Sequence, residues 1–294
     1  MSSLGFGTLQ AGDRSFFTDT DPNEYRKILK RALSMGFRHF DTAYSYREAE
    51  TLLGAAIKDS GIDREEITIT DKIMSVPTLE RKAEASLKRL KCDYIDYLLL
   101  HWPTGNEKLI YDSLKTLEKL QERGLIEHFG ISNFTVDMTS RLSSDFDIAA
   151  IERPVSLLWT KDLFTTIELA KRKDIMVFGY SPLGMGILLG KKDFSDDRKN
   201  LPCLARPELD DLINEIERLS LVKKTSKANI CLSWALSTGA DLIFIGASKM
   251  EQLDNLSEPI KLSDSEKLSL EMKADALSSS LVYDNLYGHN WKEM

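Results

Sequence analysis

The sequence has few cysteines, and none lies in a pattern that would build a site. Cys92, Cys203 and Cys231 are the only three in 294 residues, and no two are in CxxC spacing. An odd number of widely spaced thiols is typical of reduced cysteines in the cytoplasm. His128 and His289 also have no ligand-like partners nearby in the sequence. We therefore expect no disulfide framework and no bound metal.

Long apolar runs and blocks of positive charge are missing too. No stretch approaches the roughly 20 apolar residues of a membrane span. The opening residues, MSSLGFGTLQ, lack the basic and apolar regions of a signal peptide. The net charge is −7, and the densest basic run, residues 171–173, ends an expected helix, where cations are favourable. We expect a cytoplasmic protein that binds neither membranes nor nucleic acid.

Strand-like and helix-like patterns alternate along the whole chain. We expect strands at 4–9, 39–42, 67–72, 94–101, 128–132, 147–152, 175–181 and 241–245, with helices between them and a C-terminal helix at 263–277. Runs as apolar as 97–100 are typical of parallel strands covered on both faces. Eight repeats without a break in composition predict one domain over residues 1–294, an α/β fold of the (β/α)8 TIM-barrel type. The alternative is a doubly wound sheet, which usually carries a GxGxxG after its first strand; none is found here.

Polar residues recur at the ends of successive strands. Asp41, Lys72, His101 and Ser132 are separated by 31, 29 and 31 residues. The active site of such a barrel lies at the carboxyl ends of its strands, so these side chains should converge. An acid at the end of a buried strand is unfavourable unless it is paired. We expect Lys72 to be the cation for Asp41.

A tyrosine just beyond Asp41 would complete a proton donor. Either Tyr44 or Tyr46 could serve, and a nearby ammonium makes a phenol a better acid. Two chemistries remain open: attack of Lys72 on a carbonyl as a Schiff-base lysine, or hydride transfer from a cofactor with tyrosine as the acid. A purely architectural Asp–Lys pair is the third interpretation.

Six motifs then give a more specific indication. They are GFRHFDTAYSY (36–46), ITDKI (69–73), DYLLLHWP (96–103), GISNF (130–134), GYSPLGMG (179–186) and IGASKMEQL (245–253). In order and spacing they resemble the aldo-keto reductase family from Leu4 to about Leu277. The resemblance implies reduction of aldehydes or ketones with a nicotinamide cofactor. It also implies the tetrad Asp41, Tyr46, Lys72 and His101, with Tyr46 as general acid. Some members of the family are cofactor-binding regulators with little turnover, and this is the alternative function.

The resemblance further implies where a cofactor binds. The residues are Gly7, Thr8, Asp41, Ser132, Asn133, Glu152, Tyr180, Ser181, Leu183, Gly184, Gly186, Gly246, Ala247, Ser248, Lys249, Gln252 and Asn255. Ser132 and Asn133 would bind the nicotinamide carboxamide, and Tyr180 would stack on the ring. Ser248 and Lys249 lie where the family holds the 2′-phosphate, and these residue types suit a phosphate. NADPH is therefore the expected cofactor, with NADH as the alternative.

Four features depart from the family. Glu152 stands where the family has glutamine, and an ionised glutamate can only accept hydrogen bonds. A carboxylate beside the ring would also favour the positively charged oxidised cofactor, unless Arg153 neutralises it. Gln252 replaces an arginine that grips the 2′-phosphate in several subfamilies. Asn255 and Leu256 replace the usual Glu-Asn near the adenine. The N-terminal hairpin common in the family is absent, since the first strand begins at Leu4.

The substrate pocket is expected to be open and partly apolar. Its predicted residues are Leu9, Tyr46, His101, Trp102 and Phe134, and the short loop 103–107 leaves the mouth uncovered. The long charged loop 184–208 is interpreted as a mobile lid over the cofactor. The tail 278–294 is also expected to be mobile, and its aromatic residues either reach the mouth or pin the chain end. We expect a monomer or weak dimer.

The resemblance separates the two tyrosines, and this can be tested. Tyr46→Phe removes the proposed acid and should abolish carbonyl reduction, by at least about 100-fold, while cofactor still binds. The matched control Tyr44→Phe should keep most of the activity. Steady-state kinetics and a cofactor titration on both variants provide the measurement. The reverse result would mean that the stretch 39–46 has been assigned out of register.

Overall fold

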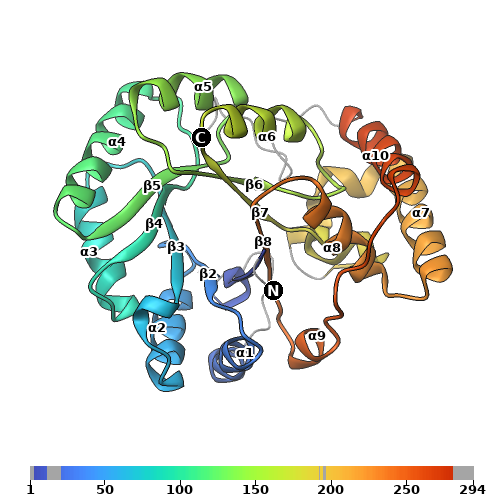
Figure 1. The fold of residues 1–294 in the computed structure, drawn as a ribbon, viewed down its shortest axis with the longest axis horizontal. Helices are drawn as coiled ribbons and strands as arrows, with labels where there is room; N and C mark the ends of the chain where they lie inside the picture. The colour runs from blue at the N-terminus through green and yellow to red at the C-terminus, as the bar shows by residue number, and fades with distance from the viewer. Residues whose placement is uncertain (1–2, 12–20, 192, 195–196, 281–294) are drawn as a thin grey trace.

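The structure, a computed structural model, describes residues 3–11, 21–191, 193–194 and 197–280. Eight parallel strands form a closed barrel in chain order, which confirms the predicted (β/α)8 fold (Figure 1). The strands are β1 (Leu4–Gly7), β2 (His39–Asp41), β3 (Thr68–Ile73), β4 (Ile95–Leu100), β5 (Ile126–Ser132), β6 (Ala150–Pro154), β7 (Met176–Tyr180) and β8 (Leu242–Ile245). They occupy the centre of the view, with helices around them.

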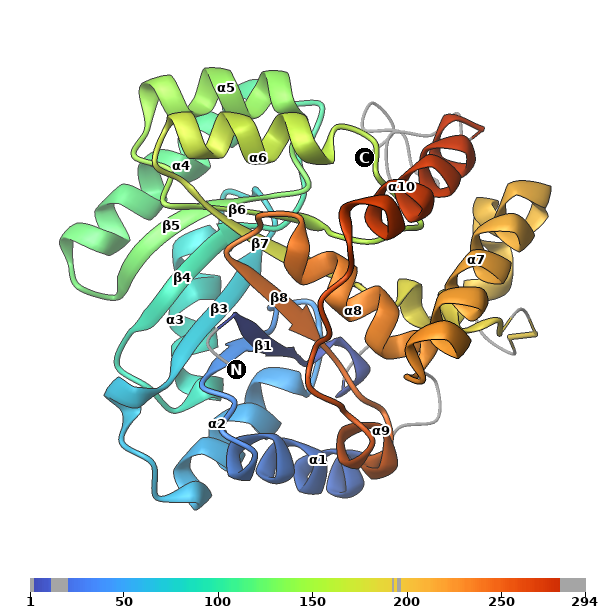
Figure 2. The same ribbon diagram turned by 45° about the vertical axis from the view of Figure 1, so that its right-hand side comes forward.

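The helices are α1 (Pro22–Ser34), α2 (Ala49–Ser60), α3 (Leu79–Leu90), α4 (Glu107–Glu122), α5 (Val136–Asp145), α6 (Leu163–Arg172), α7 (Pro207–Lys223), α8 (Lys227–Ser237), α9 (Met250–Asp254) and α10 (Asp264–Ser279). The expected C-terminal helix is therefore present as α10, which lies beside α7 at one edge of the molecule (Figures 1 and 2). No helix in these described ranges is long and apolar enough to cross a membrane.

Several element boundaries differ from those predicted. The first strand ends at Gly7 and not at Leu9, because Leu9–Ala11 forms a 3-10 turn. The sixth strand runs over 150–154 and not 147–152, because its ladder with β5 starts where Ala150 faces Gly130. The segment 184–208 contains three further 3-10 turns, at Gly184–Leu189, Asp197–Asn200 and Pro202–Ala205. Its mobility stays a prediction, and residues 281–294 of the tail lie outside the described residues.

The barrel interior has an aromatic lower layer. His39 of β2 lies edge-on to Phe178 and Phe244, with ring centroids 5.3 and 5.1 Å away, and stacks on Tyr97 at 6.1 Å. These four rings come from four different strands and close the barrel below the site. Side chains alternate between the two faces of a strand. The inward residues one step further along β2, β3 and β6 are therefore Asp41, Lys72 and Glu152.

One helix contact depends on a missing side chain. A Cβ on Gly54 of α2 would lie 2.8 Å from the Cα of Leu90 and nearer still to its carbonyl, at the end of α3. The obstacle is backbone, which cannot move aside as a flexible side chain would. The two helices can therefore pack this closely only because residue 54 is glycine.

Gly54→Ala should accordingly destabilise the protein. Overpacking against backbone costs about 1–3 kcal/mol, which exceeds the roughly 1 kcal/mol that alanine gains over glycine within a helix. Gly105→Ala is the matched control, since a Cβ there meets nothing within 4 Å. Urea unfolding of both variants measures the difference. Equal stability of the two would show that α2 and α3 can separate freely.

Candidate functional site

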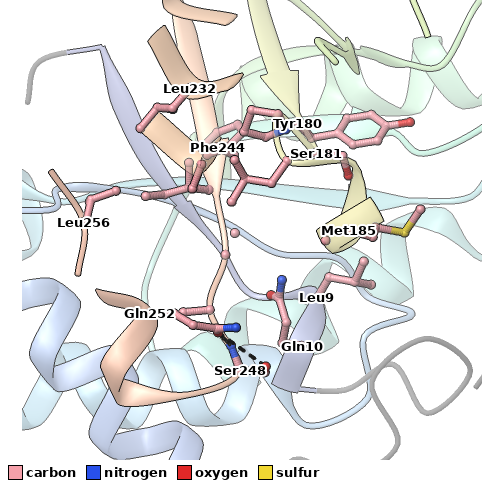
Figure 3. Close-up of a pocket in the computed structure, with 18 of the residues that line it drawn as sticks. Leu9, Gln10, Tyr180, Ser181, Met185, Leu232, Phe244, Ser248, Gln252 and Leu256 are labelled. Atoms are coloured by element: carbon pink, nitrogen blue, oxygen red, sulfur yellow. Dashed lines mark hydrogen bonds between the residues drawn. The ribbon is translucent and has the colours of Figure 1, made fainter. Parts of the chain in front are cut away.

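A cavity of about 720 Å³ opens at the carboxyl end of the barrel (Figure 3). It runs from the ends of the strands to the loops that follow β7 and β8. Most of the predicted site residues line it: Gly7, Leu9, Asp41, Tyr46, His101, Trp102, Asn133, Glu152, Tyr180, Ser181, Leu183, Gly186, Gly246, Ala247, Ser248, Lys249, Gln252 and Asn255. Residues distant in sequence thus meet at one surface.

At the base of the cavity, one lysine lies between two carboxyl groups. Lys72 is 1% exposed, and its Nζ donates to the carboxylate of Asp41 and lies 3.1 Å from Oε1 and 3.3 Å from Oε2 of Glu152. The expected Asp41–Lys72 pair is therefore present. The second carboxylate was not expected there, because Glu152 lies on β6, across the barrel from β3.

Arg153 does not neutralise Glu152. The Arg153 guanidinium donates to the carbonyl oxygens of Asp162 at 3.0 Å and Lys161 at 2.7 Å, and also to the hydroxyl of Thr166. Consecutive residues of a strand point to opposite faces. Glu152 consequently points into the barrel, while Arg153 points outward and is held by the start of α6.

Burial controls the ionisation of this cluster. It raises the pKa of Glu152 to about 8, and the nearby charge of Asp41 adds to the effect, while Lys72 opposes it. Burial also raises the pKa of Asp41. For Lys72, burial alone would lower the pKa, but the two carboxyl groups outweigh it and the pKa is raised. Lys72 is therefore an ammonium at neutral pH.

Tyr46 and His101 form the wall of the cavity above this cluster. Their rings meet edge to face with centroids 5.7 Å apart, and the Lys72 Nζ lies 5.7 Å from the Tyr46 centroid. Burial, with the charge of Lys72, holds the pKa of His101 well below its usual range. His101 is therefore neutral at pH 7, and one of its ring nitrogens carries a hydrogen that can be donated.

Tyr44 faces a different environment. Its ring packs under the guanidinium of Arg89 at 4.3 Å and the ammonium of Lys82 at 4.8 Å, both on α3. It does not line the cavity, whereas Tyr46 does. The two tyrosines that spacing could not separate are thus separated by position.

Asn133 ties three strand ends together. Its backbone is left-handed, with φ 69°, and its Nδ2 donates to the carbonyl of His101 at 3.0 Å and to the hydroxyl of Ser132 at 2.9 Å. Its Oδ1 accepts from the Tyr180 hydroxyl at 2.6 Å. Both ends of the amide are engaged within the protein, so Asn133 fixes the position of the Tyr180 ring.

Five predicted residues do not line the cavity: Thr8, Lys72, Ser132, Phe134 and Gly184. Lys72 lies directly behind Asp41 and Glu152, and Ser132 is fully buried. The Thr8 hydroxyl donates to the carbonyl oxygen of Asp41 at 2.9 Å and so joins the ends of β1 and β2. Phe134, expected as a substrate wall, is 4% exposed and belongs to the main hydrophobic core.

Gly184 is buried against Leu158, whose Cγ would lie 2.8 Å from a Cβ added there. Gly184 therefore packs the loop against the protein and does not face the cavity. Gly186, two residues further along, does line the cavity. Its φ is 94°, a backbone conformation that residues with a side chain rarely adopt. Together with Ser181 and Met185, at φ 55° and 54°, it coils the loop after β7 tightly around the cavity. Such turns expose backbone N–H groups that suit an anion.

At the far end of the cavity, Gln252 stabilises the start of α9. Its Oε1 accepts from the backbone N–H of Ser248 at 2.8 Å and of Lys249 at 3.1 Å (Figure 3). The residue that replaces the expected arginine is therefore occupied with the chain itself. Lys249 and Asn255 also line the cavity at this end, together with Glu251 and Ser257.

Sequence reasoning missed part of the lining. Gln10, which follows Leu9, and four residues at the start of α8 (Ser226, Ala228, Asn229 and Leu232) face the cavity, as do Met185 and Phe244. One signal was available for α8: the stretch ANICLSWAL, residues 228–236, is apolar almost throughout, and in the structure residues 229–235 are all buried. A helix that is apolar all round lies inside a protein, but that pattern does not indicate which side faces a cavity.

The fold and the site together define a barrel with a buried cluster of titratable side chains at its carboxyl end. The family model for the aldo/keto reductase family matches residues 3–271. The chain therefore belongs to the aldo-keto reductase family, as the motifs indicated.

The relatives are reductases. "Aldo-keto reductase YhdN" of Bacillus subtilis is 27% identical, over 87% of this chain and 84% of its own. "Methylglyoxal reductase DkgB" of Yersinia pestis is 31% identical, over 73% and 74% respectively. A solved thermostable aldo-keto reductase in complex with the inhibitor epalrestat superposes with a TM-score of 0.75 at 26% identity, covering 93% of this chain and 95% of that one. These likenesses support an oxidoreductase that acts on carbonyl groups.

The raised pKa of Glu152 predicts how stability depends on pH. The folded value, about 8, lies above the usual 4.5, so the folded protein binds more protons than the unfolded chain between these two values. The contribution of Glu152 to stability is therefore present at low pH and is lost as pH rises towards 8. Glu152→Gln cannot ionise and escapes this loss. Relative to the unchanged protein, it should gain on the order of 2 kcal/mol between pH 5.5 and pH 8.

Urea unfolding of both proteins at the two pH values gives the measurement. Groups away from the cluster are shared and cancel in the difference, so the measured change belongs to Glu152 and to Asp41, which titrates together with it. A difference in unfolding free energy that stays constant with pH would show that Glu152 keeps its usual ionisation in the folded state.

Proposed function

We propose that this protein reduces a small aldehyde or ketone to an alcohol, with a nicotinamide cofactor as hydride source and Tyr46 as proton donor. The observation that carries the proposal is the convergence at the cavity base. Asp41 and Tyr46, Lys72 and His101 come from three successive strand ends and meet around one surface that a ligand can reach. This matches the set of residues that the family motifs indicate.

Each member of the cluster has a physical task. The Lys72 ammonium stabilises the negative charge that develops on the Tyr46 oxygen as its proton leaves. Asp41 keeps Lys72 charged and fixed in place. Neutral His101, beside Tyr46, orients the carbonyl oxygen with a hydrogen bond. General acid catalysis of this kind contributes about 10²–10⁴ in rate.

The remaining lining suits a dinucleotide. Tyr180 and Asn133 lie near the cluster, the loop with Ser181 and Gly186 offers backbone to a pyrophosphate, and Lys249 stands at the far end. When bound there, the cofactor supplies the hydride. Lysine with a hydroxyl neighbour favours a 2′-phosphate and hence NADPH. Gln252 serves as a cap and does not strengthen that preference, so use of NADH is the alternative.

Reactive aldehydes are the proposed substrates. Relatives named "Methylglyoxal reductase DkgB" and "Glyoxal reductase" are 31% and 37% identical to this chain over 73% and 57% of its length. Leu9, Trp102 and Met185 give the mouth an apolar wall that suits a small carbonyl compound. A cytoplasmic location and a monomer or weak dimer stay predictions.

Two alternatives differ in what they require. Schiff-base chemistry needs a free amine, and Lys72 is buried between two carboxyl groups with a raised pKa, which speaks against it. A cofactor-binding regulator with little turnover would need only the outer part of the cavity. Glu152, which stands in place of the family's glutamine, is the observation that favours this alternative.

Replacing Lys72 tests the proposal. The protein with NADPH and methylglyoxal should consume the reduced-nicotinamide absorbance. Lys72→Met should lower kcat by at least about 100-fold, because the charge that supports Tyr46 is gone. Lys82→Met is the matched control; it removes a lysine that packs on Tyr44, outside the cavity, and should leave kcat nearly unchanged. Tryptophan fluorescence should show that NADPH still binds to both variants.

The outcomes separate the candidates. NADPH binding without turnover of any aldehyde would support the regulator and reject the reductase. Absence of binding of both NADPH and NADH would reject both. A borohydride-trapped adduct on Lys72 would restore the Schiff-base mechanism.

A further inference from the structure

Two carboxyl groups share one ammonium in the buried cluster. Both oxygens of Glu152 lie within 3.3 Å of the Lys72 Nζ, and Asp41 binds the same Nζ. Glu152 is 2% exposed and Asp41 5%. If all three groups were ionised, the cluster would carry one uncompensated negative charge away from water. Such a charge is unfavourable unless a further cation or proton balances it.

No further cation faces the pair in the described part of the chain. Arg153, the sequence neighbour of Glu152, is held on the outer side of the barrel. His101 is neutral, as its lowered pKa indicates. Among the other titratable groups near the cluster, Tyr46 lies beside His101, and Tyr180 donates its hydroxyl to Asn133.

The next carboxylates belong to a separate cluster. Asp71 of β3 points to the opposite face of its strand from Lys72, and burial together with the charge of Glu50 of α2 raises its pKa well above the usual range. Glu50 in turn is bound by Arg89. Neither carboxylate adds positive charge to the pair, so a proton is the available balance.

We infer that Asp41 and Glu152 hold one proton between them when the site is empty or contains a reduced nicotinamide, and that they release it to solvent when an oxidised nicotinamide binds. Glu152 is then a specificity-determining residue that links pH to the choice between the two cofactor forms. The inference rests on the proposed nicotinamide cofactor. In the step, one carboxyl O–H bond breaks and the proton passes to water through the cavity that both residues line; no electrons move.

The physical reason is that the positive charge of the oxidised ring takes the place of the positive charge of the proton. Two carboxyl groups this close to each other do not ionise together readily, and they titrate as a pair. A protonated carboxyl group can donate as well as accept a hydrogen bond, as a glutamine does. It can therefore serve a neutral ring and its carboxamide. A ring that carries a positive charge favours the ionised form instead.

The carboxyl pair loses its proton at a pH that a binding experiment can reach. Burial, with the charge of Asp41, raises the pKa of Glu152 to about 8. At pH 7 the proton is therefore mostly bound before any cofactor enters. Binding of the oxidised form releases it, so that affinity must strengthen as pH rises, while affinity for the reduced form stays nearly constant.

The test measures dissociation constants of NADP⁺ and NADPH at pH 6, 7 and 8 by tryptophan fluorescence. The ratio Kd(NADP⁺)/Kd(NADPH) should fall about tenfold per pH unit below the pKa of the pair. The 2′-phosphate titrates in both nucleotides and cancels in the ratio. In weakly buffered solution at pH 7, NADP⁺ binding should release about one proton per site and NADPH binding none.

Two variants make the assignment specific. Glu152→Gln should give a ratio that changes less than about twofold over the same range and should release no proton. Glu50→Gln removes a buried carboxylate that Arg89 holds on α2, outside the cavity, and should keep the full pH dependence. If Glu152→Gln does not fold, an infrared difference spectrum of the unchanged protein replaces it. NADP⁺ binding should remove one protonated-carboxyl band, while the contribution of buried Asp71 is the same in both states and cancels in the difference.

The outcomes are distinct. A pH-independent ratio in the unchanged protein, or an unaltered ratio in Glu152→Gln, overturns the inference and leaves the reductase proposal standing. An infrared difference spectrum that shows no loss of a protonated-carboxyl band on NADP⁺ binding overturns it too. If the protein binds neither nucleotide, both the inference and the proposed function fall.

Discussion

The site depends on one buried ammonium that two carboxyl groups hold in the centre of the barrel. Lys72 is 1% exposed, and an isolated charge in such a place would be strongly unfavourable. Asp41 from β2 and Glu152 from β6 make the burial tolerable, and they approach it from different sides of the barrel. The three strands can meet at these groups only in one register. A slip of one residue would turn the charged side chains towards the apolar helix layer.

The barrel interior is built to hold that register. The lower layer, with His39, Tyr97, Phe178 and Phe244, fills the space beneath the ammonium and excludes water from that side. At the upper rim, hydrogen bonds run between strand ends: Thr8 binds the carbonyl of Asp41, and Asn133 binds both His101 and Tyr180. The groups that would contact substrate and cofactor are therefore fixed by the same bonds that close the barrel.

The sequence predicted the barrel and the convergence of Asp41, Lys72 and His101 because both follow from a period, whereas Tyr46 was preferred to Tyr44 only through the family resemblance. A β-strand and its helix take about 30 residues, and the polar residue at each strand end repeats with them. Contacts between side chains on opposite sides of the barrel follow no such repeat. Lys72 and Glu152 are 80 residues apart, so their contact was not predicted, and Arg153 was considered as a partner because it is adjacent in sequence. Alternation along β6 sends Arg153 outward. The prediction that Phe134 lines the substrate pocket was wrong for a related reason. An apolar residue after a strand can belong either to a pocket or to the core.

A glutamate in this place changes what pH can alter in the site. A glutamine would leave Asp41 and Lys72 as a balanced pair with nothing to titrate near neutrality. With glutamate, one proton can be bound or lost, and the loss falls on the carboxyl groups and not on the amine. Lys72 has at least one carboxylate beside it in either state, so its raised pKa persists and its support of Tyr46 is kept. The charge presented to the proposed cofactor changes by a full unit, whereas the charge behind Tyr46, the proposed proton donor, does not. Carbonyl chemistry and cofactor preference can therefore respond differently to pH within one cluster.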